Sequence, residues 1–272
     1  MTARHRPRHL SGGRTRATWF VGAIVLLAAI WGCSSLPRPD AREPESDPQA
    51  RRLSELGRRH QLRGDLDRAE AFYVRALRVD AAFDRREGVV STLCTLGRLR
   101  LAGRDLEAAE QRFAEALEIT HGLGHPALAA RARGGLGAVC LARGDANAAA
   151  RWIEDALALP LADPGRERAV LLHDLGRVRR LQGDDPAAAD LLRCALAMHE
   201  TIGDRAGIAT TSYSLAQLHA DAGRLDQAHR DADRALQLDR ALRDAPAVLQ
   251  DLDLLRRIAG EVRDEDLALQ YA

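Results

Sequence analysis

The stretch LGAVCLARGDANAAARWIEDA, at residues 136–156, contains the pattern that decides the fold. Gly137 is followed twelve residues later by Ala149 and, after seven more, by Ala156. The same pattern occurs five times. The Gly or Ala with which it starts, called the anchor below, is at Gly57, Gly97, Gly137, Gly176 and Ala216. The steps between these anchors are 40, 40, 39 and 40 residues. A constant period of roughly 20 to 50 residues is typical of stacked supersecondary units, so the sequence predicts a solenoid.

Each unit predicts two antiparallel helices joined by a short turn. In the first unit, apolar and small residues recur at helical spacing from Leu53 to His60 and again from Leu66 to Ala76, with Gly64 and Asp65 between the two runs. Gly suits the left-handed position that ends a helix, and Asp can cap the next one. In the fourth unit we expect Asp185 to be this cap. The fold class is therefore all-α, an α-solenoid of about five helix-turn-helix repeats.

Composition and charge exclude some classes of partner. All 40 basic residues are Arg, and the first 32 residues hold five of them and no acid. The remaining chain has 35 Arg against 39 Asp and Glu, so it is mildly acidic. Nucleic-acid binding calls for a basic face or stripe. Because the sequence does not require one, we expect no nucleic-acid partner.

The amino terminus has the pattern of a secretory leader. Residues 1–18 are basic and polar, residues 19–32 are almost wholly apolar, and Cys33 follows. The apolar run is shorter than the roughly 20 residues that span a bilayer core. The segment Ile30–Ser35 resembles a bacterial lipoprotein box, which implies that Cys33 receives a lipid after the leader (1–32) is removed. An uncleaved signal anchor and a soluble export signal remain as alternatives. Ser34 resembles the pattern of lipoproteins sent to the outer membrane.

The remaining boundaries follow from composition and register. Residues 33–49 are rich in Pro and charge and poor in apolar side chains, so they predict a disordered tether. The five repeats are expected at about 50–88, 89–128, 129–167, 168–207 and 208–240. Residues 241–272 are expected to form a capping helix, over 246–259 with a polar outer face, and a tail.

The repeats resemble the tetratricopeptide repeat (TPR) family. The resemblance rests on the Leu-Gly pair of the first helix and on the Ala, large residue, Ala series of the second. The large residues are Tyr73, Phe113, Ile153, Leu192 and finally Ala232. The period is similar to the forty-residue variety of kinesin light chains, whereas the family's usual Trp and Pro positions are not matched. The resemblance covers residues 50–240 and implies a protein-interaction module.

The sequence shows no pattern of catalytic or metal-binding residues. His199-Glu200 opens like a zinc-protease helix, but Gly203 stands where the second His belongs. His121 and His125 are separated by Gly-Leu-Gly, which breaks the helix needed to bring them together. We expect Cys94, Cys140 and Cys194 to be small buried side chains. The sequence thus predicts neither an enzyme nor a site for a cofactor, a metal or a small-molecule substrate.

The resemblance also implies where a partner binds. In the family the first helices line a concave surface, chiefly one residue after the Leu-Gly pair, three before its Gly, and four to five after it. Here these positions hold Arg58, Arg98, His173, Arg177, Arg180, Tyr213 and Gln217, together with Cys94, Gly134 and Ala138. We expect a cationic groove that binds a protein or peptide segment, with Arg177 and Arg180 pairing its carboxylates.

These observations together predict a non-enzymatic adaptor. The leading interpretation is a TPR lipoprotein anchored through Cys33 in the bacterial cell envelope, with the outer membrane favoured and the solenoid in the periplasm. It would assist assembly of an envelope complex, as do lipoproteins of similar construction such as pilotins. The alternative is a cytoplasmic TPR regulator that is held by an uncleaved signal anchor and binds a signalling protein or peptide.

Overall fold

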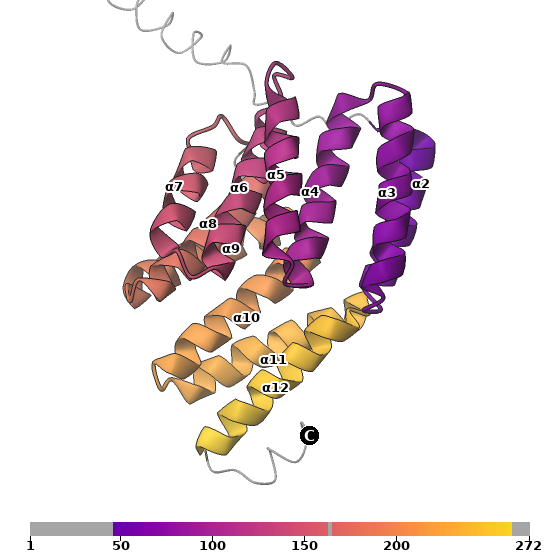
Figure 1. Ribbon diagram of the computed structural model, residues 1–272. Coiled ribbons are helices and arrows are strands. Elements are labelled where there is room, and N and C mark those ends of the chain that lie inside the picture. The colour runs from indigo at the N-terminus through magenta and orange to yellow at the C-terminus, as the bar shows by residue number, and fades with distance from the viewer. Residues whose placement is uncertain (1–45, 163–164, 263–272) are drawn as a thin grey trace, which may run out of the picture. The chain divides into compact units, whose positions relative to one another are not determined.

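The computed structural model describes residues 46–162 and 165–262, and these form eleven α-helices and no strand (Figure 1). In chain order the helices are α2 (Pro48–Gln61), α3 (Leu66–Ala82), α4 (Arg86–Ala102), α5 (Leu106–Thr120), α6 (Pro126–Ala142), α7 (Ala146–Leu157), α8 (Arg166–Leu181), α9 (Asp185–Thr201), α10 (Arg205–Asp221), α11 (Leu225–Leu242) and α12 (Ala245–Val262). The predicted all-α solenoid is confirmed. The leader, Cys33 and most of the predicted tether lie outside the described residues.

Short turns join the two helices of each repeat, with the chemistry that the sequence predicted. Gly144 ends the first helix of unit three at φ 82°, a left-handed conformation that costs glycine little. Asp145 then caps α7, because its carboxylate accepts the backbone N–H of Ala148 at 2.8 Å. Asp65 and Asp105 do the same for α3 and α5.

Three turns differ from the expectation, and in unit five Gly223 is followed by Arg224, whose side chain does not cap α11. The cap of α9 is Asp184, which accepts from the N–H of Ala187 at 3.1 Å, whereas the predicted cap, Asp185, is the first residue of the helix. In unit two the glycine comes one residue early, so Gly103 has φ −74° and Arg104 takes the left-handed position at φ 62°. The helix pair still forms because Asp105 keeps its cap.

The repeats pack with their first helices on the inside and their second helices on the outside. The first helix α6 buries residues on several sides, from Leu128 through Gly135 to Leu141, because it lies against its own partner and against both neighbouring repeats. The second helix α5 buries one stripe only, Ala109, Phe113 and Ala116. The single buried stripe is typical of a helix that faces solvent on its other side.

In the first four repeats the glycine anchor of the first helix contacts a large residue of the second helix. A Cβ atom at Gly97 would lie 2.8 Å from Phe113 Cε1, and one at Gly137 would lie 2.7 Å from Ile153 Cγ1. Gly57 faces Tyr73 and Gly176 faces Leu192 in the same way. In unit five the anchor is Ala216 and the opposing residue is Ala232, both fully buried. The anchor is therefore glycine wherever the opposing side chain is large.

The last helices return to the first repeat. In Figure 1, α11 and α12 pass below α4 and α5, and α12 begins beside the lower end of α2 and α3. The backbone N–H of Ala245 donates to the carbonyl of Leu62 at 3.0 Å. Pro246 lies next to Gly64 in the adjacent turn. The turn of the first repeat thus contacts the start of α12.

Both ends of the solenoid differ slightly from the expected boundaries. Helix α2 begins at Pro48 and is capped by Asp47, so the last residues of the predicted tether belong to the helix. Helix α12 runs from Ala245 to Val262, longer than the expected 246–259. Its outer face is not wholly polar, since Leu249 is 69% exposed. Among the described helices, none combines the length and the apolar character that crossing a membrane requires.

Candidate functional site

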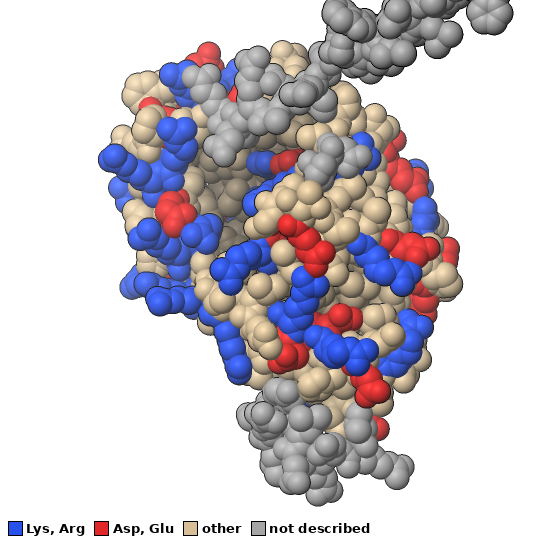
Figure 2. Space-filling view, turned by 180° about the vertical axis from the view of Figure 1, so that it is seen from behind, with Lys and Arg blue, Asp and Glu red and all other residues tan. Residues whose placement is uncertain are grey.

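The first helices of successive repeats line two adjoining hollows on the concave surface. The larger has a volume of about 550 Å³ and is lined mainly by α4, α6, α8 and α10. The smaller, of about 470 Å³, lies between α2 and α4. Arg98 and Arg131 line both hollows, which together are called the groove below. Figure 2 shows a hollow in the surface, with charged side chains gathered around its margin.

One register position of the repeat lines the groove in all five units. It lies six residues before the anchor and holds Arg51, Ser91, Arg131, Val170 and Thr210. Sequence reasoning missed it. The signal was present, because residues six before, three before and one after the anchor share one face of an α-helix. Extending the predicted stripe by one turn would have found these side chains.

Four of the seven predicted groove residues lie in the groove. Arg98, His173 and Arg177 line the larger hollow, and Arg58 lines the smaller. Gly134 and Ala138 line the larger hollow as well.

The other predicted residues lie elsewhere. Arg180 turns toward α10, where its Nη2 donates to Asp221 at 2.6 Å and its Nη1 donates to Gln217 at 3.0 Å. Tyr213 packs, partly buried, against the core between α10 and α12. Cys94 is fully buried, and burial raises the pKa of its thiol. Arg180 therefore ties two repeats together and does not face the groove.

Two glycines of α6, Gly134 and Gly135, line the larger hollow and let neighbouring side chains pack against the helix backbone. A Cβ at Gly135 would collide with the ring of Phe113, and one at Gly134 would lie 2.8 Å from Leu171 Cδ2. The two glycines thus let α6 approach its neighbours closely. Val170, which lines the same hollow, leaves 43% of its surface exposed. The hollow therefore offers an apolar contact.

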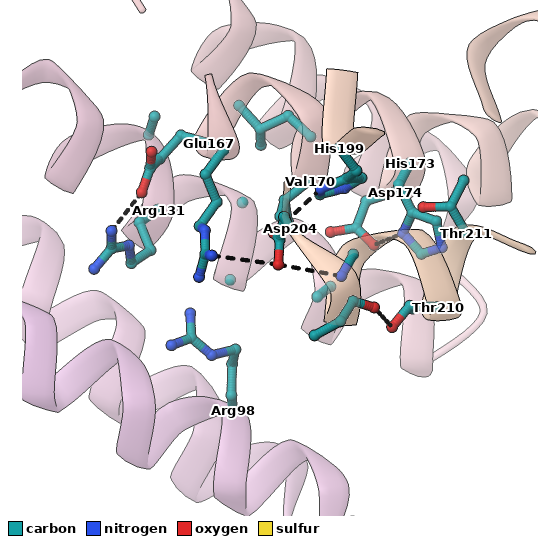
Figure 3. Close-up of a pocket in the computed structure, with 18 of the residues that line it drawn as sticks. Arg98, Arg131, Glu167, Val170, His173, Asp174, His199, Asp204, Thr210 and Thr211 are labelled. Atoms are coloured by element: carbon teal, nitrogen blue, oxygen red, sulfur yellow. Dashed lines mark hydrogen bonds and ion pairs between the residues drawn. The ribbon is translucent and has the colours of Figure 1, made fainter. Parts of the chain in front are cut away.

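The carboxylates of the larger hollow are held by cationic partners (Figure 3). Glu167 pairs with Arg131, which also donates to Ser91 Oγ at 3.2 Å. Asp204 lies 3.2 Å from His199 Nδ1 and 3.3 Å from Arg166 Nη2. The contact with His199, followed by the charge of Arg166, lowers the pKa of Asp204 against the opposing effect of burial.

Asp174 completes this network. Its Oδ1 lies 3.6 Å from Arg177 Nη1 and 3.3 Å from His173 Nδ1. The other nitrogen of His173 lies 2.9 Å from the hydroxyl of Ser214 on α10. Arg177, predicted to pair a partner's carboxylate, thus already has an acidic neighbour in the protein.

Arg98 differs from the other cations of the larger hollow. It has a hydrogen bond to Thr95 Oγ1 at 3.3 Å, and no carboxylate of the described residues is within ion-pair distance. The surrounding helices and, after them, the like charge of Arg131 lower its pKa. In Figure 3 its guanidinium projects into the hollow, and no dashed line reaches it. Of the arginines that line this hollow within the described ranges, Arg98 alone is left without an acidic partner.

Metal-ligand side chains do not converge in the part of the chain that the structure describes. No three His, Cys, Asp or Glu residues there group so as to hold a metal ion. Of the three cysteines expected to be buried, Cys94 is buried, Cys140 is partly buried and Cys194 is exposed. Cys194 falls on the outer face of α9, because it follows the buried Leu192 by two residues and so points away from the core.

Comparisons with known proteins agree with this architecture. The sequence model of the tetratricopeptide repeat family matches residues 48–121, 128–201 and 167–241. A comparison with curated proteins found no match. Among solved structures, BtubC (BKLC) from P. vanneervenii is similar with a TM-score of 0.57 and 19% identity, over 83% of this chain and 89% of that one.

Two further structures share the fold. PilW, described as a widely conserved type IV pilus biogenesis factor, has a TM-score of 0.53 and 18% identity over 83% of this chain and 91% of its own. A thermophilic TPR protein of Thermus thermophilus has a TM-score of 0.53 and 25% identity over 79% of this chain and 99% of its own. Repeat period, helix pairing and family match lead to one conclusion: the chain belongs to the tetratricopeptide repeat family.

Proposed function

We propose that this protein is a membrane-anchored, non-enzymatic adaptor whose groove binds a segment of a partner protein. Tetratricopeptide repeats are protein-interaction scaffolds and generally carry no catalytic activity. The finer proposal is that the chain is a lipoprotein, anchored through Cys33, that faces the periplasm and assists assembly of an envelope complex.

The groove is the observation that carries this proposal. It combines an exposed apolar contact at Val170 with charged side chains from successive first helices. Peptide segments are recognised by such a combination, in which pockets take side chains and polar groups fix register.

The sequence before the solenoid supports the anchoring. Cys33 follows fourteen apolar residues, and sixteen mostly polar residues separate it from Ala50. A multiply acylated cysteine anchors stably, whereas a single chain binds marginally. PilW, which shares the fold, is described as a type IV pilus biogenesis factor.

Two measurements on the full-length protein test the proposal. Metabolic labelling with palmitate is expected to label the wild type and not Cys33→Ala. A photo-crosslinking amino acid at Val170, in the groove, is expected to capture a partner protein in cells. The same group at Arg193, exposed on the outer helix α9, is the matched control.

Each measurement has a contrary outcome. If neither form is labelled while both stay in the membrane fraction, the lipoprotein is wrong and an uncleaved anchor takes its place, with a cytoplasmic regulator as the alternative function. If the groove and control positions capture the same proteins in the same yield, the groove is not the binding surface.

A further inference from the structure

The charges of the groove are unequal in number. The two hollows are lined by six arginines and four carboxylates: Arg51, Arg58, Arg98, Arg131, Arg166, Arg177, Glu55, Glu167, Asp174 and Asp204. Glu55 binds Arg58 and Arg59, and the other three carboxylates hold Arg131, Arg177 and Arg166. None of these carboxylates pairs with Arg51 or Arg98, and of these two arginines only Arg98 lines both hollows.

Arg98, which lacks an acidic partner, lies at a central position in the groove. It stands where the two hollows meet, so a segment that occupies either one passes its guanidinium. Arg131 also lines both hollows, and its positive charge repels that of Arg98. An anion bound at Arg98 would relieve that repulsion and use donors that the protein leaves open. Hydrogen bonds between ionised groups are among the stronger ones in proteins.

A buried hydroxyl group of the larger hollow has no hydrogen-bond partner in the described structure. It belongs to Thr211, which is fully buried and lines the hollow. A buried hydroxyl without a partner is costly. The hydroxyl can donate, as the guanidinium does, so both open groups suit a ligand that offers oxygen acceptors. Val170 adds its exposed apolar surface to the same hollow.

We propose that the groove recognises an acidic segment of a partner protein, in which the carboxylate of an Asp or Glu binds Arg98 and a neighbouring aliphatic side chain packs on Val170. The proposal rests on the proposed function and names the chemistry of the partner. It moves the anion site from Arg177 and Arg180, where the sequence placed it, to the junction of units two and three.

The same charges argue against a polyanion such as nucleic acid. Glu167, Asp174 and Asp204 line the hollow together with Arg98, and each would repel a chain of phosphates. In the larger hollow one open cation, Arg98, lies with the apolar surface of Val170, which suits one carboxylate with an aliphatic neighbour. Charge complementarity therefore favours a short acidic and aliphatic protein segment.

The test uses full-length protein in detergent and two pools of fluorescein-labelled octapeptides. Each peptide of the acidic pool carries a single Asp or Glu with Val, Leu or Ile beside it, and the amide pool replaces that acid by Asn or Gln. We expect the wild type to bind the acidic pool more tightly, by about tenfold or more, as a charge-assisted pair at a partly enclosed site allows. Arg98→Gln is expected to remove that preference.

Arg193→Gln is the matched control, because it removes an exposed arginine from an outer helix and should leave the preference intact. Circular dichroism melts of both variants exclude unfolding as the cause. Equal binding of the two pools overturns the inference while leaving a groove that binds segments, as the adaptor function requires. Failure to bind either pool also overturns it, and crosslinking at Val170 then decides separately on the adaptor.

The chain itself offers one competing occupant. The segment before the solenoid contains Asp40, Glu43 and Glu45, and Ser46, which follows it, lines the smaller hollow. A peptide of residues 38–46 serves as the probe for this case. If it displaces the acidic pool from the wild type and not from Arg98→Gln, the occupant is this chain's own segment and the partner proposal is wrong.

Discussion

Single residues set how closely the two helices of a repeat approach. Gly137 lets Ile153 reach its backbone, and a Cβ there would lie 2.7 Å from Ile153 Cγ1 and 3.4 Å from the carbonyl of Ala149. A β-branched side chain in a helix has little freedom to move aside. Unit five solves the same packing problem with Ala216 and Ala232. A methyl group on the first helix there faces a small residue on the second, and the helices stay in contact.

We predict that Gly137→Ala destabilises the protein and that Ile153→Ala compensates in part. The added methyl overpacks the interface at a cost of roughly 1–3 kcal/mol, which the better helix propensity of Ala offsets by about 1 kcal/mol. Ile153→Ala alone removes a buried side chain and is expected to cost about 2–5 kcal/mol. In the double variant the loss should be smaller than the sum of the two, as chemical denaturation measures.

Gly260→Ala is the control for this cycle. Gly260 lies in α12, and a methyl group added there would meet no atom within 4 Å, so the substitution is expected to stabilise the helix by about 0.5–1 kcal/mol. Strict additivity of Gly137→Ala and Ile153→Ala would show that the two positions do not compete for the same space.

At the scale of helices, α12 closes the end of the solenoid with two buried carboxyl groups. Asp251 of α12 is 1% exposed and Asp239 of α11 is 7% exposed, and each carboxyl group affects the pKa of the other. Burial, followed by the charge of Asp239, raises the pKa of Asp251 to about 8. Burial, followed by the charge of Asp244, raises the pKa of Asp239 to about 6. The pair therefore holds protons that the unfolded chain releases near pH 4.

This arrangement predicts a loss of stability with rising pH. Both folded pKa values lie above the unfolded value of 3.8, so the contribution of the pair is most favourable below about pH 4 and worsens up to about pH 8. We predict that Asp251→Asn, which is neutral and can donate to Asp239, raises the melting temperature more at pH 8 than at pH 5. The corresponding gain in the free energy of unfolding at pH 8 is on the order of a few kcal/mol.

Asp253→Asn on the same helix is the matched control. Asp253 is exposed, and its hydrogen bond to Arg256 lowers the pKa of its carboxyl, so its loss should bring no comparable gain at pH 8. A gain in stability from Asp251→Asn that is the same at both pH values would contradict the raised pKa values of the pair.

At the scale of the whole described solenoid, the contact between first repeat and last helix holds the two ends together. The hydrogen bond from Ala245 to Leu62 joins residues of α12 and of the turn after α2, which the sequence separates by nearly the whole solenoid. A single hydrogen bond of this kind contributes about 1 kcal/mol. Its loss should free the two ends without unfolding the repeats.

We predict that Ala245→Pro speeds amide hydrogen exchange in the turn at residues 62–66 and leaves the exchange of α6 unchanged. The substitution removes the donor, and proline is tolerated in the first position of a helix. Ala245→Ser keeps the N–H and is the control. Exchange that is equally fast in wild type and Ala245→Pro would mean that the contact does not hold the ends together.

The solenoid could be predicted because its determinants are local. Anchor glycines, Asp caps and the Ala series act within one repeat or between neighbours, so a period of about forty residues records them directly. The predicted cap of α9 was wrong by one residue, because Asp184 and Asp185 carry the same side chain and either could cap the helix. The groove could be predicted in outline, because the register of a helix fixes which positions share a face.

The sequence by itself thus determined the repeats, their helices and the inner face. Only the tertiary structure decided that Arg180 binds Asp221 forty-one residues away, that Arg98 lacks an acidic partner, and that α12 meets the first repeat. These features depend on the small rotation from each repeat to the next, which accumulates along the solenoid. The sequence of a single repeat does not show the accumulated rotation. The contacts that this rotation creates between side chains of different repeats therefore cannot be predicted from the period alone.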